Sequence, residues 1–183
     1  MSARDALIDA LRARATDPET RLGMGLSRRG GLPAPMTPEE RTRAEAVLGF
    51  AIPDLLADVY SRVANGGFGP GYGMNGLGGG RPDDLGQTSD ALYAGNREPM
   101  PDSPLWHWPE GLLPICDWGC GISTCIDCTD PALPMVQFDP NVLDQRMATE
   151  EALGLTGRTL ESWLRGWVEG VDLWEELYGM PSQ

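Results

Sequence analysis

The sequence predicts a single-domain α+β protein, because helix signals come first, a strand–turn–strand pattern follows, and helix signals return at the end. The chain has 183 residues, 41% of them hydrophobic, which suits one packed domain. We expect residues 1–36 to form an N-terminal helix and connector, and residues 37–178 to form the folded domain.

Three helices are expected in the first third of the chain. Residues 5–15 have apolar positions at helical spacing, and residues 16–36 form a connector rich in Gly, Pro and Arg. Thr37 and Glu40 make a capping box for a helix over residues 38–48, which Gly49 ends. Pro53 then opens an amphipathic helix whose end is marked by Asn65-Gly66-Gly67.

The centre of the chain reads as a β-hairpin. An apolar run enters at residue 112, Asp117 and Gly119 supply turn chemistry, and a second strand leaves over residues 122–128. A third strand is predicted over residues 135–138, a bent strand over 72–77, and a short helix over 89–93. Thr159 caps a helix over 160–169, another follows over 171–178, and we expect the C-terminal part to be helical.

The charge is strongly one-sided. The net charge is −13, and all 14 basic residues are Arg. Such a chain repels phosphate backbones, so nucleic-acid binding is not expected. The acidic field would attract a basic protein partner, or it serves only solubility. Residues 1–15 lack the apolar core of a secretory signal, and no apolar run is long enough to span a membrane. A cytoplasmic protein is therefore expected.

Four cysteines lie within 13 residues: Cys116, Cys120, Cys125 and Cys128. They admit two interpretations. Zinc is bound by clusters of this kind. Residues three apart on a strand point to opposite faces, however, so Cys125 and Cys128 would diverge. The alternative is that small thiols fill the core. We favour the second interpretation, and we expect the protein to bind no metal and no cofactor.

No set of residues indicates catalysis, and the candidate functional residues are those of a binding surface. The only histidine, His107, stands in a Pro-rich loop between two tryptophans. Asp83 and Asp84 follow a Gly-rich segment, where exposure is expected. Trp106 and Trp108 are candidate aromatic anchors, because exposed Trp is enriched in binding hot spots. The alternative is that both rings pack onto the sheet.

An ordered set of short motifs resembles one family. The first motifs are Glu45-x-x-Leu48-Gly49, Ile52-Pro53-x-x-Leu56 and Asn65-Gly66-Gly67. The central ones run from Trp108 through Pro114 to Ile115 and then through Asp117-x-Gly119-Cys120-Gly121, and Trp163-Leu164 with Trp167 completes the order. Together they resemble the SUKH superfamily, the group of the Smi/Knr cell-wall-assembly regulators and many bacterial immunity proteins.

The resemblance implies a central, mostly antiparallel sheet with flanking N- and C-terminal helices. It implies no catalytic residues and no obligate cofactor. Asn65, Gly66, Gly67, Pro114, Asp117, Gly119, Cys120 and Gly121 are matched as structural residues of the fold. The function implied is binding of a protein partner, most concretely a basic toxin domain that the chain neutralises. A general regulatory or scaffold protein and a four-cysteine zinc domain are the alternatives, and the oligomeric state is left open.

Overall fold

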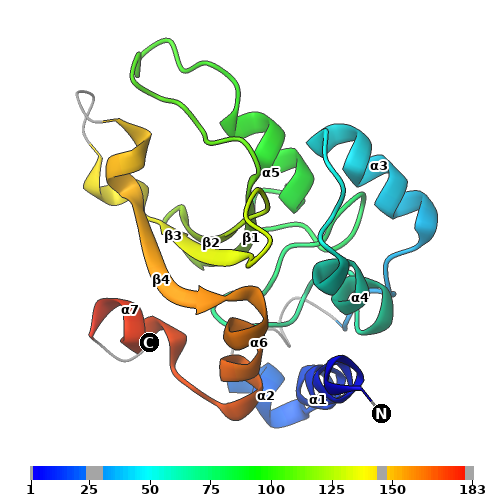
Figure 1. Cartoon of the computed structure of the whole chain (residues 1–183). Helices are drawn as coiled ribbons and strands as arrows, with labels where there is room; N and C mark the ends of the chain where they lie inside the picture. The colour runs from blue at the N-terminus through cyan, green and yellow to red at the C-terminus, as the bar shows by residue number, and fades with distance from the viewer. Residues whose placement is uncertain (1, 24–30, 144–147, 180–183) are drawn as a thin grey trace.

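A four-stranded antiparallel meander forms the centre of the protein (Figure 1). The computed structural model describes residues 2–23, 31–143 and 148–179. The strands β1 (Leu112–Gly119), β2 (Ile122–Asp127), β3 (Pro134–Phe138) and β4 (Leu153–Thr159) lie side by side in chain order. Each neighbouring pair is antiparallel. The α+β class and the first three strands are as predicted.

The fourth strand was not predicted. β4 occupies residues that we assigned to a helical C-terminal part, and Val136 of β3 pairs with Leu155. Two glycines, Gly154 and Gly157, interrupt its apolar pattern, so no period of two is visible in the sequence. The strand exists because its backbone completes the edge of β3, which is a long-range effect.

The β1–β2 hairpin turns through a two-residue loop, Cys120–Gly121. Both residues have positive φ, 53° and 77°, which is the backbone form that matches the twist of paired strands. Gly119 precedes them at φ 87°, and its amide donates to Asp117 Oδ1 at 2.8 Å. The turn chemistry predicted for Asp117 and Gly119 is therefore present, although the loop itself lies one residue later.

The predicted N-terminal helices are present with small shifts of their ends. They are α1 (Ala3–Thr16), α3 (Pro38–Leu48) and α4 (Asp54–Arg62). Thr37 and Glu40 form the expected capping box, and Gly49 ends α3 at φ 78°. A further short helix, α2 (Pro18–Gly23), lies in the segment that we predicted as connector. Residues 24–30 of that connector lie outside the described residues.

The remaining helices come before and after the strands in the sequence. α5 (Ser89–Asn96) runs three residues longer than predicted, α6 (Leu160–Glu169) follows β4 directly, and α7 (Leu173–Tyr178) comes last. Two short 3₁₀ helices, η2 (Pro140–Val142) and η3 (Thr149–Ala152), connect β3 to β4. In Figure 1, α5 runs near β1, and α6 lies close to α1.

The bent strand predicted over residues 72–77 does not form. Only Met74 makes a β-bridge, to Cys116 of β1. Glycines surround it, and a Gly-rich backbone loses too much freedom to hold a regular strand. Main-chain hydrogen bonds to β1 hold the segment, from the amide of Tyr72 to the carbonyl of Asp117 at 2.8 Å and from the amide of Asn75 to the carbonyl of Ile115 at 2.9 Å. A side chain adds to them, since the Tyr60 hydroxyl donates to the carbonyl of Asn75 at 2.6 Å.

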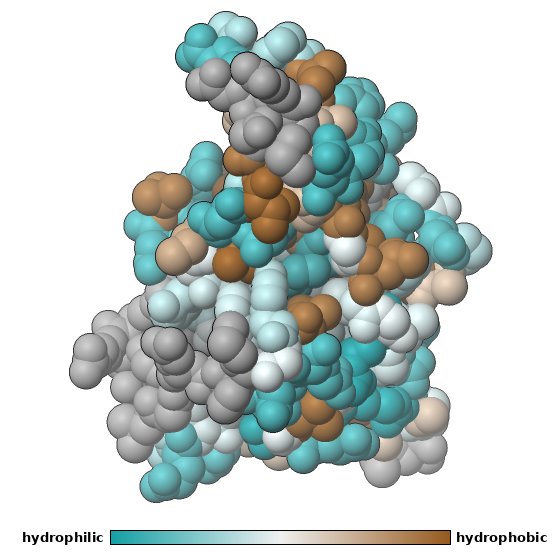
Figure 2. All heavy atoms as spheres, turned by 90° about the vertical axis from the view of Figure 1, so that its left-hand side faces the viewer, coloured by the Kyte–Doolittle hydropathy of each residue, from teal (hydrophilic) through white to brown (hydrophobic). Residues whose placement is uncertain are grey.

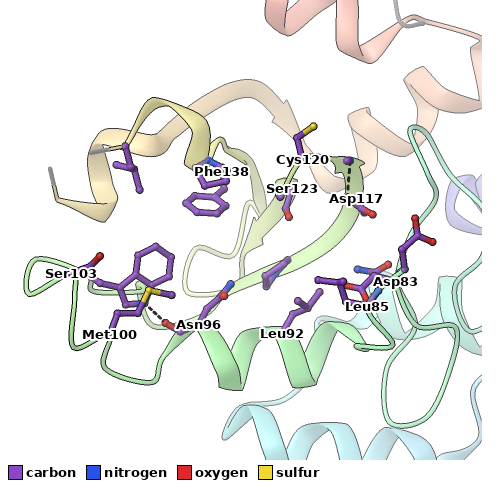
Figure 3. Close-up of a pocket in the computed structure, with 18 residues that line it drawn as sticks. Asp83, Leu85, Leu92, Asn96, Met100, Ser103, Asp117, Cys120, Ser123 and Phe138 are labelled. Atoms are coloured by element: carbon purple, nitrogen blue, oxygen red, sulfur yellow. Dashed lines mark hydrogen bonds between the residues drawn. The ribbon is translucent and has the colours of Figure 1, made fainter. Parts of the chain in front are cut away.

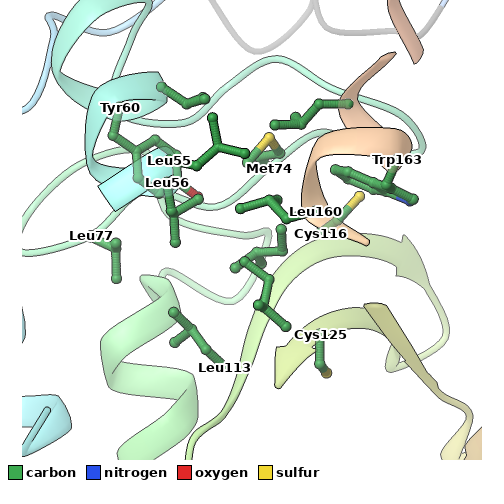
Figure 4. Close-up of a cluster of buried hydrophobic side chains, with 14 of the residues drawn as sticks. Leu55, Leu56, Tyr60, Met74, Leu77, Leu113, Cys116, Cys125, Leu160 and Trp163 are labelled. Atoms are coloured by element: carbon green, nitrogen blue, oxygen red, sulfur yellow. The ribbon is translucent and has the colours of Figure 1, made fainter. Parts of the chain in front are cut away.

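One hydrophobic core joins the helices to the sheet (Figure 4). Tyr60 and Leu56 from α4, Leu113 from β1 and Trp163 from α6 are all fully buried. α1 contributes to the same core through three buried side chains, Leu7, Ile8 and Leu11. The N-terminal helix therefore packs with the domain that follows it. Every helix in the described part of the chain is too short or too polar to span a bilayer.

Candidate partner-binding groove

A groove of about 720 Å³ lies between α5, the loops on either side of it and the β1–β2 hairpin (Figure 3). Its walls come from five separate stretches of the chain: residue 75, residues 83–85, residues 92–106, residues 114–123 and residues 138–143. Three of the four predicted partner-binding residues, Asp83, Asp84 and Trp106, line it.

Acidic side chains gather in one part of the groove. Asp83 Oδ1 accepts hydrogen bonds from the amides of Leu85 (2.9 Å) and Gln87 (2.8 Å), which hold the carboxylate in place. Asp84 is exposed beside it, and Asp117 lines the groove from β1. Among the described lining residues, three are aspartates and none is basic. The groove therefore carries a negative potential of its own.

Apolar side chains form another part of the groove. The Trp106 indole is fixed because its Nε1 donates to the carbonyl of Asn96 at 2.7 Å. Its ring lies edge-on to Phe138, with 6.1 Å between the ring centroids. Met100 is 43% exposed at the rim. A rigid aromatic wall with exposed apolar neighbours is a surface that another protein can cover.

Exposed apolar residues also mark the surface as a whole. Figure 2 shows the face on the left of Figure 1, where hydrophobic residues gather mainly in the upper half among hydrophilic ones. Leu85, which follows the two aspartates and lines the groove, is 84% exposed. An exposed leucine beside a concave site adds area that a partner can bury.

Trp108 does not belong to this surface, and its assignment as an exposed anchor is wrong. The side chain is only 2% exposed, and its Nε1 donates to the carbonyl of Leu112 at 2.7 Å. Its ring stacks on Trp106 and meets Phe138 edge-on at 5.0 Å. The indole is buried because the sheet offers it both an apolar face and a carbonyl acceptor. Trp106 is half-buried and keeps part of its ring on the groove.

The residues matched as structural members of the motifs fall into two places. Pro114, Asp117, Gly119, Cys120 and Gly121 line the groove as parts of the hairpin. Asn65, Gly66 and Gly67 lie at the end of α4, where Asn65 is buried and bonds the main chain of Leu77. The hairpin residues therefore shape one wall of the groove as well as the turn.

The four cysteines lie in different environments. Cys116 and Cys125 are buried, Cys128 is half-buried and Cys120 is exposed at the hairpin turn. Burial raises the pKa of the Cys116 and Cys125 thiols, and it raises the pKa of Cys128 to about 12. The part of the chain that the structure describes contains no group of three or more His, Cys, Asp or Glu placed to hold a metal ion.

Several residues of the groove had no signal in the sequence. Leu85, Met100, Leu92 and Asn96 stand in loops or on a short helix, and Phe138 ends a strand. None shares a period or motif with the others. Only the tertiary structure brings them to one surface.

Comparison with known proteins identifies the family. Residues 35–166 match the SMI1 / KNR4 family (SUKH-1). No curated protein and no solved structure shows significant similarity to the chain. The match covers well over half of the chain, so the protein belongs to the SMI1 / KNR4 family. Domains of this family are generally non-catalytic, and membership points to protein–protein interaction.

Proposed function

We propose that this SMI1 / KNR4 family protein is a non-catalytic, cytoplasmic immunity protein that binds and neutralises a toxin domain. The observation that carries the proposal is the groove, which combines fixed carboxylates with an aromatic wall. Binding surfaces need both features, because charge guides the encounter and buried apolar area slows dissociation.

Electrostatics supports a basic partner. The net charge of −13 produces an attractive field for a basic domain. The aspartates of the groove can then contact basic side chains of that domain directly. Long-range attraction is screened over about 8 Å at physiological ionic strength. Association should therefore slow steeply as salt is added, while dissociation changes little.

The direct test is growth rescue. The toxin domain encoded by a gene adjacent to this one is expressed alone and together with this protein, and survival and complex formation are measured. Rescue and a stable complex are expected. Absence of any adjacent toxin gene, or a toxin that kills equally with and without the protein, would overturn the immunity role and favour a general regulatory or scaffold protein.

A charge variant tests the groove within that assay. Asp83→Asn with Asp84→Asn should slow association, because the acidic attraction falls while Asn keeps an oxygen for the amides that Asp83 holds. Glu169→Gln is the control, since Glu169 is exposed on α6 and does not line the groove. Equal association rates for the two variants would place the contact elsewhere.

A further inference from the structure

We propose that the groove receives an extended segment of the partner in which an arginine or lysine stands beside a large apolar residue. The inference rests on the proposed binding function and specifies the chemistry that the groove recognises. It follows from the volume of the groove, from the separation of its charged and apolar parts, and from the fixed positions of their side chains.

The volume indicates an inserted segment. Sites of roughly 300–1,000 Å³ enclose a drug-sized molecule or a few side chains, and the groove measures about 720 Å³. A folded partner surface therefore does not enter as a whole. A projecting loop or terminus that inserts its side chains fits this space.

The two parts of the groove lie at different ends of it. In Figure 3, Asp83 and Asp117 lie on one side with Leu85, whereas Met100 and Ser103 lie on the other, with Phe138 above them. A ligand with one kind of side chain would satisfy one end only. A segment with a basic residue and an apolar residue as neighbours reaches both.

The Asp83 carboxylate is already held in a position to bind a cation. Its Oδ1 is held by two main-chain amides, and its Oδ2 has no hydrogen-bond partner among the described residues. A guanidinium or ammonium group that binds there gains a charge-assisted hydrogen bond without ordering the carboxylate first. Asp84 adds a second negative charge next to it.

Aromatic side chains at the apolar end of the groove are also held in place. Phe138 is 6% exposed and its ring packs edge-on with the ring of the buried Trp108, and Trp106 is held by its hydrogen bond to Asn96. Met100, by contrast, stands at the rim, and its flexible thioether adapts to different apolar side chains. This end favours Leu, Met or Phe in the segment.

The test uses four hexapeptide amides and ¹H–¹⁵N NMR of the whole protein. The reference peptide is Gly-Ser-Arg-Leu-Ser-Gly, and the others replace Arg by Gln, Leu by Ser, or both. The amides of Gly119, Gly121 and Ser123 and the indole N–H of Trp106 report on the groove, and the indole of the buried Trp163 reports on the core. With the reference peptide we expect shifts at the groove at about 1 mM.

Each single replacement should weaken binding about three- to tenfold, with the double replacement weakest. Asp83→Asn with Asp84→Asn should abolish the advantage of Arg over Gln and keep that of Leu over Ser. Met100→Ala should do the reverse. Leu155→Ala is the matched control, since Leu155 is 78% exposed on β4 and outside the groove.

Equal affinity for the four peptides, shifts confined to other surfaces, or no shift up to about 5 mM would each overturn the inference. These outcomes are separate from those of growth rescue. Rescue without peptide binding would leave the immunity role and remove this recognition chemistry. Peptide binding without rescue would support the groove as a peptide-binding site and overturn the proposal that the partner is a toxin.

Discussion

The carboxamide of Asn65 forms hydrogen bonds with both the carbonyl and the amide of Leu77. Its Nδ2 donates to the carbonyl of Leu77 at 2.8 Å, and its Oδ1 accepts from the amide of Leu77 at 2.9 Å. Asn65 is 1% exposed, so these bonds are sealed from water. One side chain thus holds the main chain at Leu77, beyond the residues of the segment that pair with β1, and Gly80 packs directly on it without room for a Cβ.

Asn65→Ala should lower the free energy of unfolding by about 2–4 kcal/mol. Both hydrogen bonds are lost, and the amide of Leu77 stays buried without a partner, whereas its carbonyl keeps only the bond from the Gly80 amide. Urea unfolding measures the change. Gln87→Ala is the control, because Gln87 is exposed and should shift stability by less than about 0.5 kcal/mol. Equal midpoints for the two variants would show that the pairing does not hold the segment.

Gly119→Val should destabilise the hairpin by about 1–3 kcal/mol. Gly119 has φ 87°, which β-branched residues avoid, and a Cβ there would lie 2.6 Å from Cε2 of Tyr72. Chemical denaturation provides the measurement. Gly154→Ala is the matched control in β4, since its Cβ would meet nothing within 4 Å and its φ is not positive. Similar losses for both would mean that backbone strain is not the cause.

Local signals explain which parts of the fold were predictable. Thr37, Glu40 and Gly49 specify both ends of α3 within a dozen residues, and Thr159 does the same for the start of α6. β4 has no such signal. Its place depends on pairing with β3, and nothing within the strand encodes that partner.

The groove was predictable only in part, for a related reason. The sequence predicts exposure for Asp83, Asp84 and Trp106, and the fold brings all three to one groove. Trp108 followed the same reasoning and is buried, because burial of a loop tryptophan depends on what the sheet places beneath it. Phe138 and Met100 come from segments that the sequence does not connect, so only the tertiary structure joins them.

Glu45→Gln should reduce the loss of stability in acid. Glu45 Oε1 accepts from Arg41 Nε at 2.8 Å and from the amide of Ile52 at 3.0 Å, so it connects α3 to the segment that leads into α4. The Arg41 hydrogen bond is the main cause that holds the pKa of Glu45 below its usual value of 4.5.

A lowered carboxylate pKa stabilises the fold above the pKa of the unfolded chain, and this stability is lost as the pH falls through the folded value. Between about pH 5 and pH 3, the native protein should therefore lose up to about 1 kcal/mol more than Glu45→Gln, whose amide oxygen keeps a neutral acceptor. Urea unfolding at both pH values gives the difference. Parallel pH profiles would contradict the role of this carboxylate.

Cys120 should be the one rapidly reacting thiol of the folded protein. It is exposed at the hairpin turn, whereas Cys116 and Cys125 are buried with a raised pKa, and burial raises the pKa of Cys128 to about 12. At pH 8 Cys116 and Cys125 therefore lack both access and thiolate, and the half-buried Cys128 lacks thiolate. Titration with a disulfide reagent should show one fast thiol per chain, absent in Cys120→Ser, and four after unfolding. Two fast thiols, or a fast thiol that survives the substitution, would contradict the burial. Because Cys120 lines the groove, a bound partner that occupies the groove should slow this reaction, whereas a partner bound elsewhere should leave its rate unchanged.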